Sequence, residues 1–220
     1  MPSSADSPNP RLINVDERIL VMTLVFTMLS ASVDGYVSGR NARPGAGLGD
    51  GGQIFDWFSN GDYPSREYPN MRLSPPNAAV IDFHGTRVGA FVSGRTTYEH
   101  ADRWGGDSPK PGVPLFVLSR EPIPDADPRQ TIVTDGIESA IEEAKAVAEK
   151  AGKDVAVVSG ATVTEALKAG LLDEIVINQR PVLLGGGHPF FRELPDAIQL
   201  ECTSVAVNSG VVHLTYRVLK

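Results

Sequence analysis

Residues 157–167, VVSGATVTEAL, decide the fold: a short apolar run passes through Ser159-Gly160-Ala161 directly into a helical pattern. A strand that ends in small residues and turns at once into a helix is typical of α/β proteins. The first N–H groups of a helix have no partner within the helix and carry partial positive charge, so such a turn is a potential phosphate site. Thr162 and Glu165 have the spacing of a capping box, which leaves an ordinary capped helix as the alternative.

The same alternation of strands and helices extends in both directions from this junction. The spacing of apolar residues predicts strands at residues 88–93, 114–118, 131–133, 155–158 and 174–179, and helices at residues 78–87, 137–151 and 162–169, with a short helix from Thr96. This order predicts an α/β fold with a mainly parallel sheet covered on both faces. The C-terminal segments 203–207 and 211–218 flank Asn208-Ser209-Gly210, which predicts an antiparallel hairpin.

Composition and charge narrow the class of protein. The 220 residues carry a net charge of -7 with a pI near 5.1, so we expect neither nucleic acid nor a membrane as a partner. Residues 18–220 are expected to form one domain after a disordered tail at residues 1–17. One cysteine, Cys202, and four scattered histidines predict no metal site, and we expect Cys202 to be a buried structural thiol.

The apolar run at residues 19–29 resembles the hydrophobic segment of a signal peptide, but two acids, Asp16 and Glu17, precede it where basic residues are expected. The run is also too short to span a membrane. We therefore expect a buried first strand here and a cytoplasmic protein.

Two turn-rich segments, residues 39–52 and 60–76, flank a short helix predicted at residues 53–59. The sequence GLGDGG at residues 47–52 matches the dinucleotide fingerprint G-x-G-x-x-G, but no strand directly precedes it and the following helix is short. We interpret residues 39–52 as a flexible flap.

A second strand-to-helix junction lies at residues 91–99, FVSGRTTYE. Arg95 begins its helix, and Ser119 and Arg120 follow the next strand. Arginines beside a hydroxyl suit a phosphate monoester such as the 2′-phosphate of NADPH. The alternative is that both arginines are solvated surface residues.

Six motifs then stand in an order found in one superfamily: SASVDGYVSG, FDWF, VSGRTTYE, VPLFVLSREP, VVSGATVTEAL and PVLLGGGHPFF. Over residues 18–220 the chain resembles the dihydrofolate reductase-like family, in particular the reductase domain of the bifunctional riboflavin-biosynthesis deaminase-reductase and its stand-alone bacterial relatives. The resemblance implies NADPH as cofactor and a three-layer dihydrofolate-reductase-like fold. It also implies the cofactor-binding residues Val37, Ser38, Gly94, Arg95, Thr96, Thr97, Ser119, Arg120, Ser159, Gly160, Ala161, Thr162 and Val163.

Two acids are candidates for substrate chemistry. A desolvated carboxylate can anchor an amino-heterocycle or relay a proton, and Asp56 stands roughly where dihydrofolate reductases carry such an acid. Asp34 is the second candidate, although Asp before Gly commonly makes a turn. Gln53 and Trp57 are expected to line the same pocket.

The sequence thus predicts an NADPH-dependent reductase acting on a small nitrogen heterocycle such as a pterin or a flavin-precursor pyrimidine. Two alternatives stay open: a reductase of a specialised-metabolite intermediate, and a non-catalytic nucleotide-binding sensor. The zinc-deaminase signature is absent from the sequence. The resemblance and the C-terminal hairpin together lead us to expect a homodimer.

Overall fold

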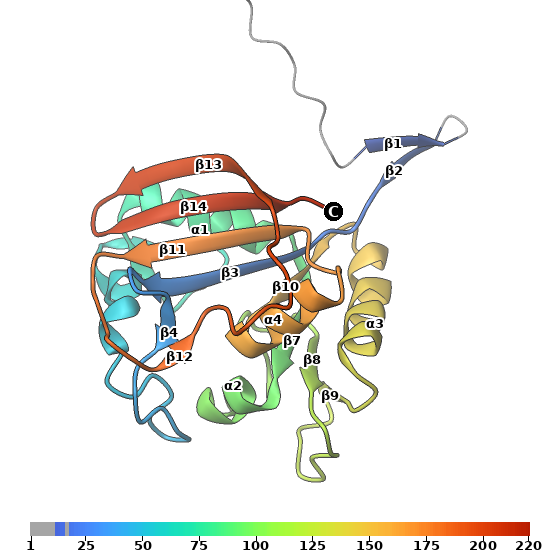
Figure 1. Ribbon diagram of the computed structural model, residues 1–220, viewed down its shortest axis with the longest axis horizontal. Helices are drawn as coiled ribbons and strands as arrows, with labels where there is room; N and C mark the ends of the chain where they lie inside the picture. The colour runs from blue at the N-terminus through green and yellow to red at the C-terminus, as the bar shows by residue number, and fades with distance from the viewer. Residues whose placement is uncertain (1–11, 16–17) are drawn as a thin grey trace, which may run out of the picture.

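The computed structural model describes residues 12–15 and 18–220. The tail predicted at residues 1–17 falls mostly outside this range, but its described part, Leu12–Val15, is strand β1. This strand pairs antiparallel with β2 (Arg18–Val21), and the hairpin projects from the body of the molecule (Figure 1). The apolar run at residues 19–29 is therefore divided between β2 and β3 (Val25–Ser32) rather than forming one strand.

An eight-stranded sheet is the centre of the molecule. Its order is β13-β14-β11-β3-β10-β7-β8-β9. The six strands from β11 to β9 are parallel, and β14 and β13 add antiparallel at the other edge. The bounds are β7 (Val88–Gly94), β8 (Leu115–Leu118), β9 (Gln130–Val133), β10 (Asp154–Val157), β11 (Glu174–Arg180), β13 (Leu200–Asn208) and β14 (Val211–Val218).

The remaining elements are helices and short strand pairs. Four α-helices are present in the described residues: α1 (Pro75–Thr86), α2 (Arg95–His100), α3 (Ile137–Lys150) and α4 (Gly160–Lys168). The 3-10 helices are η1 (Gly52–Ile54), η2 (Asp56–Ser59) and η3 (Asp102–Gly106). Strand β4 (Tyr36–Ser38) pairs with β12 (His188–Pro189), and β5 (Tyr63–Pro64) pairs with β6 (Arg72–Leu73).

Alternating side chains of the strands build a core on each face of the sheet, as expected for strands buried on both sides. Val155 and Val157 of β10 belong to the cluster that α3 and α4 cover. Ala156, between them, belongs to the opposite cluster with Phe26 and Phe91. In Figure 1, α4 lies in front of the sheet and α1 behind it. The prediction of a sheet covered on both faces is confirmed.

Helix α4 begins two residues before its predicted start. Ser159 is its N-cap residue but makes no capping hydrogen bond through its side chain, and Thr162 is a buried residue of the first turn. The predicted capping box is therefore wrong.

Cys202 was expected to be a buried structural thiol, but it lies exposed on the edge strand β13.

Among the described residues, no helix has the length and apolar character needed to cross a membrane. A single buried first strand was predicted at residues 19–29. Only residues 25–29 of this run belong to the central sheet, as part of β3, which lies between β10 and β11.

Gly160 tests how tightly the start of α4 is packed. A Cβ at this position would lie 2.7 Å from the Pro189 carbonyl oxygen and 3.0 Å from that of Phe190. We expect Gly160→Ala to destabilise the fold by about 1–3 kcal/mol through overpacking, measured by denaturant unfolding. Gly52→Ala is the matched control because a Cβ at Gly52 meets no atom within 4 Å. Equal stability of the two variants would contradict the close approach.

Candidate active site

An outer groove of about 630 Å³ lies beyond the carboxyl ends of β7, β8 and β10. Open parallel sheets bind ligands at this edge. Three arginines line the groove: Arg95 of α2, Arg120 after β8, and Arg192. Of the predicted cofactor residues, the groove also brings together Gly94, Thr96, Ser119, Ser159, Ala161 and Thr162. Two acids, Glu121 and Glu165, lie at the same groove, so its positive charge is local to the arginines.

The start of α4 supplies N–H groups to this edge. The first hydrogen bond of the helix runs from the Val163 N–H to the Ser159 carbonyl, so the N–H groups of residues 160–162 have no helical acceptor. Thr97 donates its hydroxyl to Ser159 Oγ over 3.1 Å, which joins α2 to α4. A Cβ on Gly94 would meet Thr162 Oγ1 at 2.6 Å. The two junctions predicted from the sequence therefore lie in direct contact.

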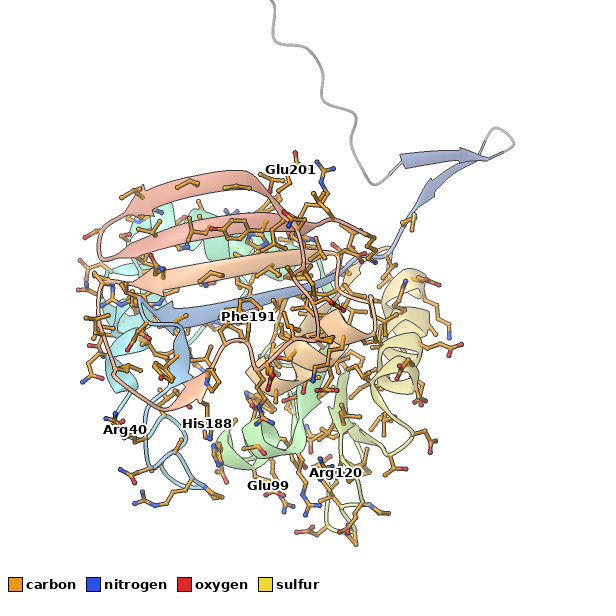
Figure 2. The ribbon with its side chains drawn as sticks, in the orientation of Figure 1. Arg40, Glu99, Arg120, His188, Phe191 and Glu201 are labelled. Atoms are coloured by element: carbon orange, nitrogen blue, oxygen red, sulfur yellow. The ribbon has the colours of Figure 1, made fainter. Side chains whose placement is uncertain are left out.

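An inner cavity of about 140 Å³ continues from the groove, with which it shares Thr96, Ser159, Ala161 and Arg192. Val37, Ser38, Thr97 and Gly160 of the predicted set line it. Ser38 Oγ lies 2.8 Å from His188 Nδ1, and the rings of His188 and His100 are 5.8 Å apart. Burial, followed by the nearby His188, lowers the pKa of His100. Figure 2 shows His188, Glu99 and Arg120 on the same side of the molecule, with Glu201 on the opposite side.

The segment predicted as a flexible flap is a compact loop held by backbone hydrogen bonds. The Gly39 N–H donates to the Leu48 carbonyl over 3.0 Å, and the Asp50 N–H donates to the Arg40 carbonyl over 3.1 Å. A Cβ on Gly47 would meet the His100 carbonyl oxygen at 2.3 Å, so the loop packs against the end of α2. Gly47 and Leu48 thereby form one wall of the inner cavity.

An apolar pocket of about 260 Å³ adjoins the inner cavity and shares Leu29, Ser30, Phe55 and Val158 with it. Aromatic and aliphatic side chains form most of its wall, and the lining residues with a polar side-chain group are Ser30, Tyr68, Trp104 and Asn178. No side chain that lines this pocket carries a charge. Burial raises the pKa of Tyr68, which keeps its hydroxyl neutral.

Trp104 lines this pocket from an unusual backbone turn. Asp102, Arg103 and Trp104 have φ values of 50°, 53° and 48°, in the left-handed region that L-residues rarely adopt. Hydrogen bonds hold the turn from outside: Arg103 Nη1 donates to Asp125 Oδ2 over 2.8 Å, and Gln130 Nε2 donates to the Arg103 carbonyl over 2.7 Å. The turn places Trp104 on the wall of the apolar pocket.

Asp56 does not lie in an apolar pocket, and this expectation is wrong. Residues 52–59 form 3-10 turns with three residues per turn, so residues three apart share a face. Ile54 and Trp57 form the buried row, while Gln53 and Asp56 form an exposed row. Gln53 consequently does not line the pocket either. Trp57 is buried behind the pocket, where its Nε1 donates to Ser30 Oγ over 3.1 Å.

Asp34 fixes a loop. Its two carboxylate oxygens accept the N–H groups of Leu184 and Gly185 over 3.1 and 2.7 Å. The hydroxyl of Ser32 and the N–H groups of Gly185 and Leu184 lower the pKa of this exposed carboxyl. Asp34 is thus a poor proton donor near neutral pH and serves to hold the 184–187 segment next to β4.

Val163 is the predicted cofactor residue that the structure separates from the site. Its side chain is fully buried in the core against α3, and its N–H belongs to the helix. Sequence reasoning missed Arg192, His100 and Asn178 as lining residues. Only Arg192 has a local signal, since it directly follows the recognised PVLLGGGHPFF motif.

The chain is similar in sequence to known proteins. A family model described as the RibD C-terminal domain matches residues 23–214, so the chain belongs to this family. It is 25% identical over 219 residues to the uncharacterized protein YyaP of Bacillus subtilis (strain 168), with 92% of this chain and 96% of YyaP covered.

Two solved structures show the same fold. A putative riboflavin biosynthesis protein from Shewanella sp. PV-4 has 25% identity and a TM-score of 0.63, covering 90% of this chain and 100% of its own. Dihydrofolate reductase from Enterococcus faecalis, complexed with NADP(H) and RAB-propyl, has 17% identity and a TM-score of 0.53, covering 90% and 97%. The recognised superfamily and the dihydrofolate-reductase-like α/β fold are confirmed, and both support an oxidoreductase of this type.

His213 gives the structure a testable dependence on pH. Burial among Asn77, Asn178 and Trp57 lowers its pKa from 6.5 to about 4. In the unfolded chain the imidazole takes up a proton near pH 6.5, but in the folded protein it stays neutral until about pH 4, so acid favours unfolding. We expect the free energy of unfolding to decrease as the pH is lowered from 6.5 to about 4, measured by urea unfolding at a series of pH values. His213→Asn should reduce this slope, and an unchanged slope would contradict a neutral buried His213.

Proposed function

We propose that this member of the RibD C-terminal domain family is an NADPH-dependent reductase that transfers a hydride to a small conjugated ring compound. The continuity of three spaces carries the proposal: the arginine-lined outer groove opens into the inner cavity, which adjoins the apolar pocket. A long dinucleotide needs a charged site for its phosphates and a partly enclosed site for its nicotinamide. The order of these spaces matches that requirement.

The residues of the groove fit the phosphates of NADPH. Arg120 and Ser119 would hold the 2′-phosphate, and Arg95 would hold an adenosine phosphate, because arginine pairs with phosphate through charge-assisted hydrogen bonds. The N–H groups of residues 160–162 at the start of α4, which have no acceptor within the helix, would receive the pyrophosphate. The Enterococcus faecalis neighbour is complexed with NADP(H), which supports the same cofactor here.

Val37 and Ser38 would lie beside the nicotinamide in the inner cavity. NADPH would supply the hydride there. Ser38 is held by its contact with His188, and the apolar side chains of Leu48 and Phe55 also line this cavity. The apolar pocket would then hold the substrate ring next to the inner cavity, since four residues border both spaces.

The nitrogen-heterocycle class expected from the sequence stays a proposal, but the pocket lacks the carboxylate that was expected to anchor an amino-heterocycle. The homodimer also stays a proposal. The nearly fully exposed edge strand β13, which carries Val205 and Val207, offers a surface for it.

Cofactor titration tests the proposed function. We expect purified protein to bind NADPH more tightly than NADH, followed by nicotinamide fluorescence. Arg120→Ala should weaken NADPH binding by about 10- to 100-fold, the loss of a hydrogen bond to a charged group, and leave NADH binding nearly unchanged. Arg95→Ala should weaken the binding of both NADPH and NADH, because the adenosine phosphates are common to the two cofactors.

Arg129→Ala is the matched control, since Arg129 is exposed on a neighbouring loop, pairs with Asp127 and does not line the groove. Equal affinity for both cofactors, or none for either, would contradict the proposal. Tight NADPH binding without oxidation by any panel of conjugated ring acceptors would favour the sensor alternative.

A further inference from the structure

Behind the apolar pocket lies a buried polar cluster that the proposed function leaves unexplained. It consists of Asn77 of α1, Asn178 of β11 and His213 of β14, each 3% exposed or less. His213 Nδ1 lies 2.7 Å from Asn178 Oδ1, and His213 Nε2 lies 3.1 Å from Asn77 Oδ1. Only Asn178 of these three lines the pocket. The cluster therefore reaches the pocket through one amide.

The ring nitrogen of His213 that carries the hydrogen determines whether the oxygen or the NH₂ group of the Asn178 amide faces the imidazole. A neutral imidazole has one N–H donor and one acceptor nitrogen, so it cannot donate to both amide oxygens. The 2.7 Å contact suits an N–H···O hydrogen bond and is short for a bond between two nitrogens. Nδ1–H therefore donates to Asn178 Oδ1, and Asn77 turns its amide NH₂ toward Nε2.

This arrangement commits the oxygen of the Asn178 amide to His213 and leaves its NH₂ group as a donor. Within the part of the chain that the structure describes, no hydrogen bond from Asn178 Nδ2 is formed, and Asn178 lines the pocket. A donor of this kind next to a cavity is satisfied only by a ligand or by water.

Ser30 provides a second donor beside the first. Its Oγ accepts the Trp57 Nε1–H over 3.1 Å, so the hydroxyl hydrogen remains to be donated. Ser30 and Asn178 are directly paired residues of the neighbouring parallel strands β3 and β11, and both line the pocket. Ser30 and Asn178 thus present two adjacent hydrogen-bond donors to a pocket that is mostly apolar.

We propose that Ser30 and Asn178 form a carbonyl-binding site, and that the ligand of this pocket is an uncharged, mainly apolar ring compound with a carbonyl oxygen. His213 and Asn77 are positioning residues that fix the Asn178 amide. The inference deepens the proposed function, on which it rests only in identifying the ligand as the substrate. A charged ligand fits poorly because no side chain lining the pocket can pair with it.

Matched ring compounds test the site by isothermal titration calorimetry, without cofactor. Coumarin offers a carbonyl oxygen and no N–H, whereas 2H-chromene has the same ring skeleton without the carbonyl. We expect coumarin to bind about 10-fold more tightly than 2H-chromene, the contribution of hydrogen bonds to otherwise unpaired donors. Indole, which offers only an N–H, should bind no better than 2H-chromene, and coumarin-3-carboxylate should bind more weakly than coumarin.

Variants separate positioning from simple structural support. Asn178→Leu should bring the coumarin to 2H-chromene affinity ratio close to 1, and His213→Leu should lower it. His213→Asn should restore the ratio, because its amide nitrogen takes the place of Nδ1 as donor to Asn178. Unchanged binding of 2H-chromene in each variant is the internal control for an intact pocket.

The proposal is overturned if coumarin and 2H-chromene bind equally, if indole binds most tightly, if the carboxylate is preferred, or if none of the four compounds binds. NADPH titration of the same preparation keeps the two proposals apart. Carbonyl selectivity without NADPH binding would reject only the reductase function, and NADPH binding without carbonyl selectivity would reject only the site at Ser30 and Asn178.

Discussion

The close packing of the end of β7 and of the segment at Pro189 against the start of α4 is the constraint on which the candidate site depends. At Gly160, the first residue of α4, a Cβ would meet the backbone carbonyls of Pro189 and Phe190, and at Gly94, the end of β7, it would meet the Thr162 hydroxyl. Because β7 and β10 are neighbouring parallel strands, their ends open onto the same edge of the sheet. The packing therefore brings the arginines of the outer groove and the wall of the inner cavity to one place.

The charges of the site are separated along its length. The chain has a net charge of -7, yet three arginines gather at the outer groove, and no charged side chain lines the apolar pocket. An unpaired charge in such a pocket loses its hydration without compensation. A ligand that spans these spaces is thus held with its charged part outside and its neutral part inside, and the neutral His213 behind the pocket agrees with this order.

Sequence periodicity predicted most strands of the sheet, but it misplaced β3 and was insufficient for the site. The helix predicted at residues 137–151 is α3 at Ile137–Lys150, because its apolar residues recur at helical spacing. The start of α4 was misplaced because a capping pattern at Thr162 and Glu165 competed with the small residues before it. Asp56 was misplaced because a 3-10 turn, not an α-helix, decides which side chain is buried. Asn178 and His213 meet across paired strands, and no local pattern signals such a contact.

The left-handed turn at Asp102, Arg103 and Trp104 shows that the position of the pocket wall is set by more than the hydrophobic effect. Each L-residue in this conformation costs about 1–2 kcal/mol relative to a right-handed turn. Arg103 partly offsets this cost: it contacts Asp125 and lies against the Tyr98 ring, and its carbonyl accepts the Gln130 amide. Tyr98 in turn donates to Gln130 over 2.8 Å, so Gln130 holds both the ring and the turn. A buried polar residue of β9 thereby fixes Trp104 on the wall of a pocket that Gln130 itself does not line.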